Sequence, residues 1–321
     1  HNNIKLRHKN YKKLINNYKD TIANIAKNNI KIICYNFMPI VDWTRTQLDF
    51  KLPTDGLALK FNYLQIIIFE MFILKLKNLE NRYSKKEIAD AELLYKKMKP
   101  KDLNNMKLSI MGGLPASNKI DSLSDFKKML DAYKNVEHGD LRENLRDFIR
   151  EIIPTAEEYD VKMAIHPDDP PMSLFGVPRI VSTYEDYKYI LNSYNSESNG
   201  MTFCSGSLAS NIHNDIYKIF NKFKDKINFI HLRNVKIEKD KKSFYESNHL
   251  SGDVDFVKLI KMILKEEKRR SKNKKINIPM RPDHGHALLD DQKKKTLNPG
   301  YTAIGRLMGL SELRGIIKAL Q

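Results

Sequence analysis

The stretch "VKMAIHPDD" (161–169) begins as an apolar run and ends in polar side chains that can take part in chemistry. Its β-branched and apolar residues are typical of a buried strand. The same pattern recurs in four other segments: "KIICYNFMP" (31–39), "GMTFCSGS" (200–207), "INFIHLR" (227–233) and "INIPMRPDHGH" (276–286). We therefore predict five buried strands, each followed by residues suited to a functional site.

Helical periodicity separates these strands. It is found before each of them in turn, at residues 11–28, 141–159, 183–194, 214–224 and 253–273. Thr183 and Asp186 have the spacing of a capping box, and Asn214 or Asp215 is expected to begin the following helix. Alternation of strand and helix predicts an α/β fold in which parallel strands are joined by right-handed crossovers.

Residues 44–115 depart from this alternation. The segment runs from "TRTQLDFKLP" to "IMGGLP", is much longer than an ordinary loop between strand and helix, and carries helical patterns of its own. Structureless loops of such length are rare in compact domains. We expect a helical insertion that forms a cap above the strand ends, within a single domain that spans 1–321.

Composition limits the classes of function. The chain has 321 residues, of which 41% are hydrophobic, so it can bury a sizeable core. Its formal net charge of +17 comes from lysines scattered over many segments, which favours a solvated basic surface over a nucleic-acid-binding stripe and is compatible with an anionic substrate. With only two cysteines and no apparent signal peptide or membrane-spanning run, a reducing cytoplasm is the simplest expected compartment.

The predicted strand ends bring together residues that bind metals. They are His166, Cys204, His231 and Asp283, with His284 beside the last. Two imidazoles, a thiolate and a carboxylate form a credible ligand set for a divalent transition metal. The ligands are 38, 27 and 52 residues apart, about one strand–helix unit each, whereas a structural zinc site draws close pairs from one or two turns.

Each of these residues also has an ordinary structural interpretation. A lone buried cysteine usually fills a core, and a lone histidine at a strand end is more often a packed polar residue than a ligand. Four candidates at four consecutive strand ends favour a metal site at the mouth of a sheet or barrel. Cys34 lies inside its strand and is assigned to packing.

Further candidates surround the predicted metal site. Asp169 in "HPDDPP" is placed to bond a ligand or a substrate hydroxyl, and Arg233 is two positions after His231, on the same side of the strand, where it can hold a carboxylate. Arg281 and His249 are additional candidates for substrate contacts. Tyr301 follows a Pro-Gly turn and, close to a cation, would titrate low enough to exchange protons.

Several long strings of unusual composition give the chain a specific resemblance. "CYNFMPIVDWTRT", "MAIHPDDPP", "VPRIVST", "HLSGDVD" and "MRPDHGHALLDDQKKKTLNPGYTAIGRLMGLSELRG" occur in an order that resembles the mannonate dehydratase family along essentially the whole chain. The resemblance implies a xylose-isomerase-like (β/α)₈ TIM barrel that uses Mn²⁺ or Fe²⁺ to dehydrate D-mannonate to 2-keto-3-deoxy-D-gluconate in hexuronate catabolism.

The resemblance also implies residue roles. The metal ligands would be His166, Cys204, His231 and Asp283, and the acid/base pair would be His284 and Tyr301. The sequence does not decide which member of the pair removes the C2 proton and which protonates the departing C3 hydroxyl. The family is often oligomeric, so a homo-oligomer is possible.

The resemblance has one departure. The family barrel has three strands before "KIICYNFMP", so the chain is expected to be an N-terminally incomplete version containing the last five strand–helix units. Five parallel strands do not close an eight-stranded barrel. Two other functions remain open at this point: a divalent-metal sugar or sugar-acid isomerase on a similar barrel, and an inactive truncated remnant. A scaffold that binds nucleic acid through its lysines is a third, weaker possibility.

Overall fold

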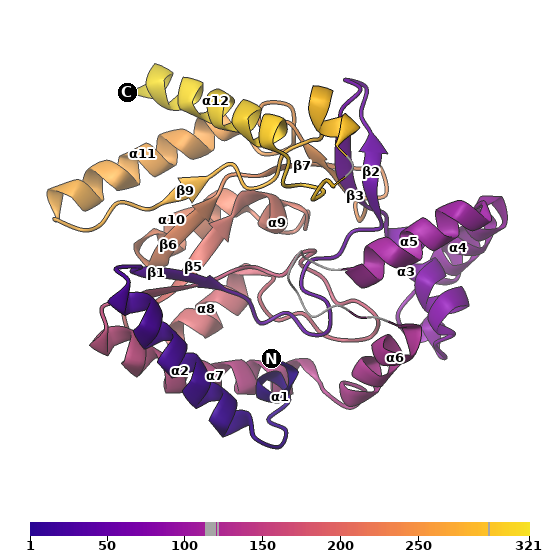
Figure 1. Ribbon diagram of the computed structural model, residues 1–321, viewed down its shortest axis with the longest axis horizontal. Helices are drawn as coiled ribbons and strands as arrows, with labels where there is room; N and C mark the ends of the chain where they lie inside the picture. The colour runs from indigo at the N-terminus through magenta and orange to yellow at the C-terminus, as the bar shows by residue number, and fades with distance from the viewer. Residues whose placement is uncertain (113–119, 121, 295) are drawn as a thin grey trace.

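Two β-sheets and their surrounding helices make up the fold (Figure 1). We describe it from a computed structural model, which covers residues 1–321 apart from 113–119, 121 and 295. One sheet is parallel and has the strand order β1-β4-β5-β6-β9; the other is antiparallel and has the order β2-β3-β8-β7. The parallel sheet and its helices lie on one side of the view, and the β2–β3 hairpin with α3, α4 and α5 lies on the other.

The parallel sheet confirms the predicted α/β class. It curls as half of a barrel does, and all four of its neighbouring strand pairs are parallel. The five strands match the five predicted segments in order: β1 (Ile32–Tyr35), β4 (Lys162–Ile165), β5 (Asn199–Cys204), β6 (Ile227–His231) and β9 (Met280–Arg281). The shared direction places the carboxyl ends of all five strands, and the side chains that follow them, at one edge of the sheet.

The last strand is much shorter than its apolar pattern predicts. Only Met280 and Arg281 pair with β6, although the pattern extends over 276–286. Pro279 and Pro282 flank the pair, and a proline has no N–H with which to continue the hydrogen-bond ladder. The polar stretch from Asp283 onward is therefore released from the sheet and turns across its edge.

The predicted helices are present with small shifts at their ends. They are α2 (Tyr11–Lys27), α7 (His138–Glu158), α8 (Tyr184–Asn192), α10 (Ile216–Phe223) and α11 (Phe256–Lys272). The capping box of Thr183 with Asp186 is confirmed, and Asp215 caps α10 through the backbone N–H groups of Tyr217 and Lys218. Burial of their apolar faces, which includes Ile149 and Ile152 on α7 and Ile260 on α11, packs these helices onto the core.

The segment 44–115 was predicted to be a helical insertion, but it contains strands as well as helices. It opens with β2 (Gln47–Lys51) and β3 (Leu57–Phe61), which pair with each other. β3 also pairs with β8 (Phe244–Ser247), and β8 pairs with β7 (Asn234–Ile237), both from much later in the chain. The helices follow: α3 (Tyr63–Ile68), the π-helix η1 (Phe69–Leu74), the 3₁₀ helix η2 (Leu79–Asn81), α4 (Lys85–Lys97) and α5 (Pro100–Gly112). Residues 113–115 lie outside the described residues.

Local sequence patterns did not predict this second sheet, because its strands pair across a long sequence separation. Phe61 on β3 stacks on Phe244 on β8, with ring centroids 5.4 Å apart, and both side chains are fully buried. The two residues are more than 180 positions apart. Whether the segment acts as a cap over the strand ends stays a prediction.

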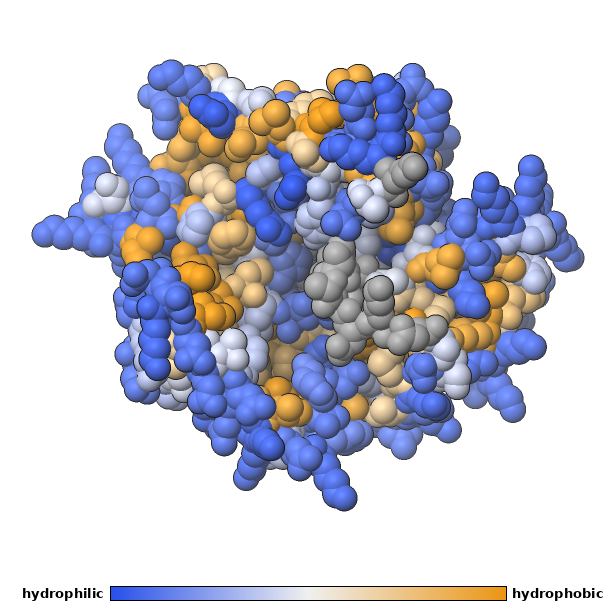
Figure 2. Space-filling view, viewed as in Figure 1, coloured by the Kyte–Doolittle hydropathy of each residue, from blue (hydrophilic) through white to orange (hydrophobic). Residues whose placement is uncertain are grey.

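The remaining elements are all helices. They are α1 (Asn2–Lys5), α6 (Leu123–Ala132), α9 (Ser205–Ala209), α12 (Ala303–Leu320) and the 3₁₀ helices η3 (Lys224–Lys226) and η4 (Leu289–Lys293). The outer rim of the face shown in Figure 2 is largely hydrophilic, in keeping with the many lysines. Among the described residues, no helix is long and apolar enough to cross a membrane.

Two glycines allow α12 to lie directly against the polar stretch that follows β9 and against His249, which follows β8. A Cβ on Gly305 would lie 2.1 Å from the carbonyl oxygen of His286, and one on Gly309 would lie 2.3 Å from Cε1 of His249. Neither neighbour has room to move, because both histidines are buried. The close approach of α12 therefore fixes the backbone around residues 284–286.

A glycine pair in α12 tests this close approach. Gly305→Ala is expected to lower the free energy of unfolding by about 1–3 kcal/mol, because the added methyl group clashes with backbone. Gly315→Ala has open space and is expected to raise stability by about 0.5–1 kcal/mol, through the better helix propensity of alanine. Urea denaturation of both variants provides the measurement, and equal effects would contradict the packing described.

Candidate metal centre and active site

Three of the four predicted metal ligands meet in one buried cluster. His166 follows β4, Cys204 ends β5 and His231 ends β6, so neighbouring parallel strands bring them to the same edge. One potential ligand atom from each lies within 4.8 Å of the others. Donors held at about 2.0–2.3 Å from one cation lie at most about 4.6 Å apart, so the cluster is close to the size of a transition-metal site and offers the nitrogen and sulfur donors of one.

The two imidazoles are oriented as ligands. Nε2 of His166 lies 3.1 Å from Nδ1 of His231, while Nδ1 of His166 donates to the carbonyl oxygen of Pro167 at 2.6 Å. That donation leaves a lone pair on Nε2, the atom that faces the cluster. Burial lowers the pKa of His166, which favours the neutral form that binds metal.

The thiol of Cys204 completes the cluster from β5. Its side chain is fully buried, and Sγ accepts a hydrogen bond from Oγ of Ser207 at 3.2 Å. Ser207 lies one turn later in α9, the short helix that begins directly after the strand. Cys34 is outside the cluster, as expected. It is exposed on the edge strand β1 and not in the core, although its Sγ lies 3.1 Å from Oγ1 of Thr202.

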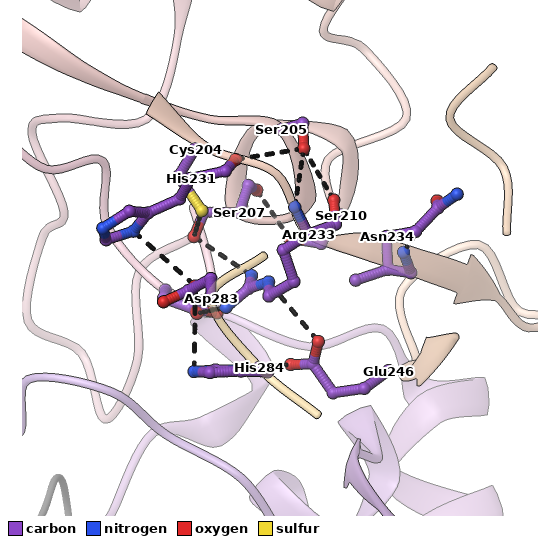
Figure 3. A network of polar contacts seen from close by, with 12 residues as sticks. Cys204, Ser205, Ser207, Ser210, His231, Arg233, Asn234, Glu246, Asp283 and His284 are labelled. Atoms are coloured by element: carbon purple, nitrogen blue, oxygen red, sulfur yellow. Dashed lines mark hydrogen bonds and ion pairs between the residues drawn. The ribbon is translucent and has the colours of Figure 1, made fainter. Parts of the chain in front are cut away.

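The predicted fourth ligand, Asp283, lies beside the cluster. Its Oδ2 is 3.6 Å from Nδ1 of His231, and its Oδ1 accepts from Arg281 at 2.9 Å (Figure 3). Burial opposes ionisation of Asp283, but His231, His284 and Arg233 outweigh it and hold the pKa of this carboxyl well below its usual range. The backbone at Asp283 has a φ of 66°, a left-handed conformation that aspartate tolerates better than most residues. The turn thereby directs a charged carboxylate towards the histidines.

The predicted acid/base pair, His284 and Tyr301, lies directly beyond Asp283. Their ring centroids are 5.1 Å apart in an edge-to-face arrangement, and Nε2 of His284 is 3.9 Å from Oδ2 of Asp283. A backbone bridge between Gly285 and Tyr301 holds the two segments together. Burial and the charge of Asp283 raise the pKa of Tyr301 above its usual range, so the protein groups alone favour the protonated phenol and not the low titration expected from sequence.

Trp43 forms a further wall of the site. Its ring lies edge-on to His284, with ring centroids 5.8 Å apart. The backbone of Trp43 pairs with that of Asp169 in an isolated parallel β-bridge. The indole N–H is buried and has no hydrogen-bond partner within the described structure. No role was predicted for Trp43 from the sequence, although this tryptophan lies in one of the strings that carry the family resemblance.

Two residues predicted to contact substrate are engaged in a buried ion network. Arg233 donates to Asp169 at 2.5 Å and to Oγ of Ser207 at 3.0 Å, and Asp169 also receives a bidentate pair from Arg45 at 2.8 and 3.2 Å. Burial opposes ionisation of Asp169, but Arg233 and Arg45 hold its pKa well below its usual range. Arg233 and Asp169 are thus engaged with each other and with Arg45 and Ser207, and a contact of either with substrate stays a prediction.

Glu246 and Arg45 are the members of this network that sequence reasoning missed. Glu246 lies on β8 of the antiparallel sheet, and Arg45 precedes β2 in the same sheet. Arg45 donates to Glu246 at 2.6 Å, and Nδ1 of His284 lies 3.1 Å from the same carboxylate. Arg45 lies in a resemblance-bearing string, but Glu246 lies in none of them, so only the pairing of β8 with β3 could have found it.

The last two predicted substrate contacts have different environments. His249 is buried against α12, and its Nε2 lies 2.8 Å from the carbonyl oxygen of Leu232 and 3.2 Å from that of Pro282, so it braces backbone behind the site. The side chain of Arg281 is 48% exposed and lies at the rim next to Asp283. Arg281 therefore has the accessibility that a contact to substrate requires.

Two histidines and a cysteine cluster at the ends of parallel strands, with a carboxylate, an imidazole and a phenol beside them. This arrangement defines the class of metal-dependent α/β enzymes. Comparisons with known proteins define the family. A model of the D-mannonate dehydratase (UxuA) family matches residues 1–321. The chain belongs to the D-mannonate dehydratase family, whose members are lyases.

Individual relatives agree with the family assignment. Mannonate dehydratase of Marinomonas sp. (strain MWYL1) is 42% identical over 317 residues, which are 98% of this chain and 81% of the relative. That of Saccharophagus degradans (strain 2-40 / ATCC 43961 / DSM 17024) is 42% identical over 323 residues, with 100% and 81% covered. The crystal structure of mannonate dehydratase from Streptococcus suis serotype2 superposes with a TM-score of 0.75 at 33% identity and covers 100% of this chain and 75% of that one.

The two cysteines provide a matched test of the metal centre. Co²⁺ bound by the wild-type protein is expected to show thiolate-to-metal charge-transfer absorption, because Cys204 supplies a sulfur ligand. Cys204→Ser should abolish that absorption and weaken Co²⁺ binding at least about tenfold, whereas Cys34→Ser should leave both unchanged. Charge-transfer absorption that survives in Cys204→Ser would exclude Cys204 as a ligand.

Proposed function

We propose that this protein dehydrates D-mannonate to 2-keto-3-deoxy-D-gluconate and water, with Mn²⁺ or Fe²⁺ held by His166, Cys204, His231 and Asp283. The observation that carries the proposal is the convergence of three of these ligands within 4.8 Å, directly beside the His284–Tyr301 pair. Membership of the D-mannonate dehydratase family supplies the substrate and the reaction. Five strands of the family's eight-stranded barrel would correspond to the parallel sheet seen here.

The reaction requires a proton to leave C2 and a hydroxyl to leave C3. The C2 proton is weakly acidic, and its removal places negative charge on the neighbouring carboxylate. A divalent cation, when bound, stabilises that charge. The remaining demand is general acid/base catalysis by two groups that reach adjacent carbons.

His284 and Tyr301 meet this demand by position. Their rings are in contact, they come from different segments, and Nε2 of His284 is on the side of Asp283 and the ligand cluster. One of the pair takes the C2 proton and the other protonates the departing C3 hydroxyl. The edge-to-face packing with Trp43 limits the freedom of the His284 ring and keeps water from that side.

Arg281 is the best placed of the predicted substrate contacts. Its guanidinium is half-exposed at the rim, and a sugar-acid carboxylate that binds there would be next to the ligand cluster. The guanidinium of Arg233 is instead 2% exposed and surrounded by partners. We therefore propose that Arg281 binds the substrate carboxylate and that Arg233 with Asp169 supports the site from beneath.

A sugar or sugar-acid isomerase is the alternative that shares this architecture. Such an enzyme would typically surround its metal with carboxylates, whereas the cluster here contains a thiol and two imidazoles. The matches to D-mannonate dehydratases over the whole chain also favour dehydration over isomerisation. The dehydratase is therefore the proposal that the site and the relatives jointly support.

Turnover of D-mannonate tests the proposed function. With Mn²⁺ under reducing conditions, the protein should form a 2-keto-3-deoxy acid, detected as its semicarbazone. His284→Gln and Tyr301→Phe should each lower kcat by about 100-fold or more, because each removes one proton-transfer group. Tyr194→Phe changes a remote phenol that bonds Glu157 and should leave kcat within about twofold. Absence of product from the metal-loaded wild type would refute the proposal.

Loss of the Arg281 guanidinium tests substrate binding separately. Arg281→Ala should raise KM for D-mannonate about tenfold or more, because a charged hydrogen bond to the carboxylate contributes about 1.5–3 kcal/mol. Arg314→Ala, an exposed arginine on α12, serves as the control and should leave KM unchanged. Weaker Mn²⁺ binding in Arg281→Ala with an unaltered KM would show that Arg281 supports Asp283 and does not bind substrate.

A further inference from the structure

Glu246 is a buried carboxylate that belongs neither to the ligand cluster nor to the acid/base pair. Glu246 is 3% exposed and comes from β8, in the sheet that contributes none of the metal ligands. In Figure 3 its carboxylate points at the ring of His284, on the side away from His231. Nδ1 of His284 lies 3.1 Å from Oε1 of Glu246, a hydrogen-bonding distance.

We propose that Glu246 is the positioning residue for the catalytic imidazole. Its carboxylate accepts a hydrogen bond from Nδ1–H of His284 and so presents Nε2 to the substrate. This inference rests on the proposed dehydratase function of the site. An ionised carboxylate has no proton to give, so in this hydrogen bond the nitrogen must be the donor. In the neutral ring the proton then resides on Nδ1, and Nε2 is left with a lone pair on the side of Asp283.

The charges around Glu246 keep it ionised and fix its position. Arg45 donates to Oε1 at 2.6 Å, and Nε of Arg233 lies 3.4 Å from Oε2. Burial opposes ionisation, but Arg233, His284 and Arg45 lower the pKa of this carboxyl to about 2. The carboxylate is thus an acceptor across the working range of the enzyme.

The backbone around Glu246 is equally constrained. Val235 on β7 is paired with Glu246 in the antiparallel ladder, and the carbonyl oxygen of Glu246 lies 3.1 Å from Nε2 of His286. One residue thus holds His284 with its side chain and His286 with its main chain. The second sheet thereby determines the ring orientation of a residue that follows a strand of the first sheet.

The tautomer of His284 gives a test that requires no turnover. Long-range ¹H–¹⁵N spectra of Zn²⁺-loaded, ¹⁵N-histidine-labelled protein at alkaline pH report which ring nitrogen carries the proton, and His284→Gln identifies the signal. We expect the wild type to carry the proton on Nδ1. A neutral His284 with the proton on Nε2 would overturn the proposal.

Variants of Glu246 test the same assignment through catalysis. Glu246→Gln keeps the shape but can turn an NH₂ group towards Nδ1, so kcat should fall about 100-fold or more, which is a larger change than the accompanying change in KM. Glu246→Asp keeps the acceptor and should recover much of that loss. Glu238→Gln, directly after β7 of the same sheet and paired with Lys60, is the matched control and should leave kcat within about twofold.

A double variant separates positioning from general support. If Glu246 acts through His284, Glu246→Gln in a His284→Gln background should lower kcat by no more than about twofold further. The proposal would be overturned if the double variant showed the product of the two single-variant losses in kcat. A kcat of Glu246→Gln within threefold of the wild type would overturn it as well. If Glu246→Gln does not fold, the tautomer of His284 in the wild-type protein still tests the role of Glu246. If the wild type does not turn over D-mannonate, the proposed function fails, whereas the spectra still report on Glu246 and His284.

Discussion

The buried ion network of Arg45, Asp169, Arg233 and Glu246 is the constraint on which the active site depends. No side chain in it is more than 3% exposed, and each guanidinium contacts both carboxylates. Two positive and two negative charges balance, which offsets the cost of their removal from water. Loss of any one member would leave an unpaired buried charge, at a cost of about 3–5 kcal/mol. Such a network holds only one arrangement of the segments that supply it.

Those segments come from both sheets, so the network joins the two halves of the fold. Asp169 and Arg233 follow β4 and β6 of the parallel sheet, whereas Arg45 precedes β2 and Glu246 lies on β8 of the antiparallel sheet. His166 and His231 are respectively three positions before Asp169 and two before Arg233. The ion pairs that join the sheets therefore also hold the segments that carry two of the proposed metal ligands. Glu246 extends the same restraint to His284.

Sequence patterns predicted the parallel half of this arrangement well and the antiparallel half poorly. Buried parallel strands are continuous apolar runs, so the segments that end in His166, Cys204 and His231 were recognisable locally. The β2–β3 hairpin pairs with β8 across more than 180 residues. The segment that contains β2 and β3 was predicted as a helical insertion, and β7 and β8 were not predicted at all. The exposure of Cys34 and the shortness of β9 likewise depend on neighbours, an open sheet edge and two flanking prolines.

The sequence by itself determined the α/β class, the order of the five parallel strands, the donor types of the metal cluster and the family. These follow from local periodicity, from the chemistry of single side chains and from long strings of residues, none of which requires distances between remote segments. Only the tertiary structure decided which charged residues face one another: that Arg233 and Asp169 pair beneath the site, that Arg281 lies at its rim, and that Glu246 reaches His284. The reason is physical. An ion pair is fixed by the packing of two sheets, and no local pattern in the chain specifies the distance between them.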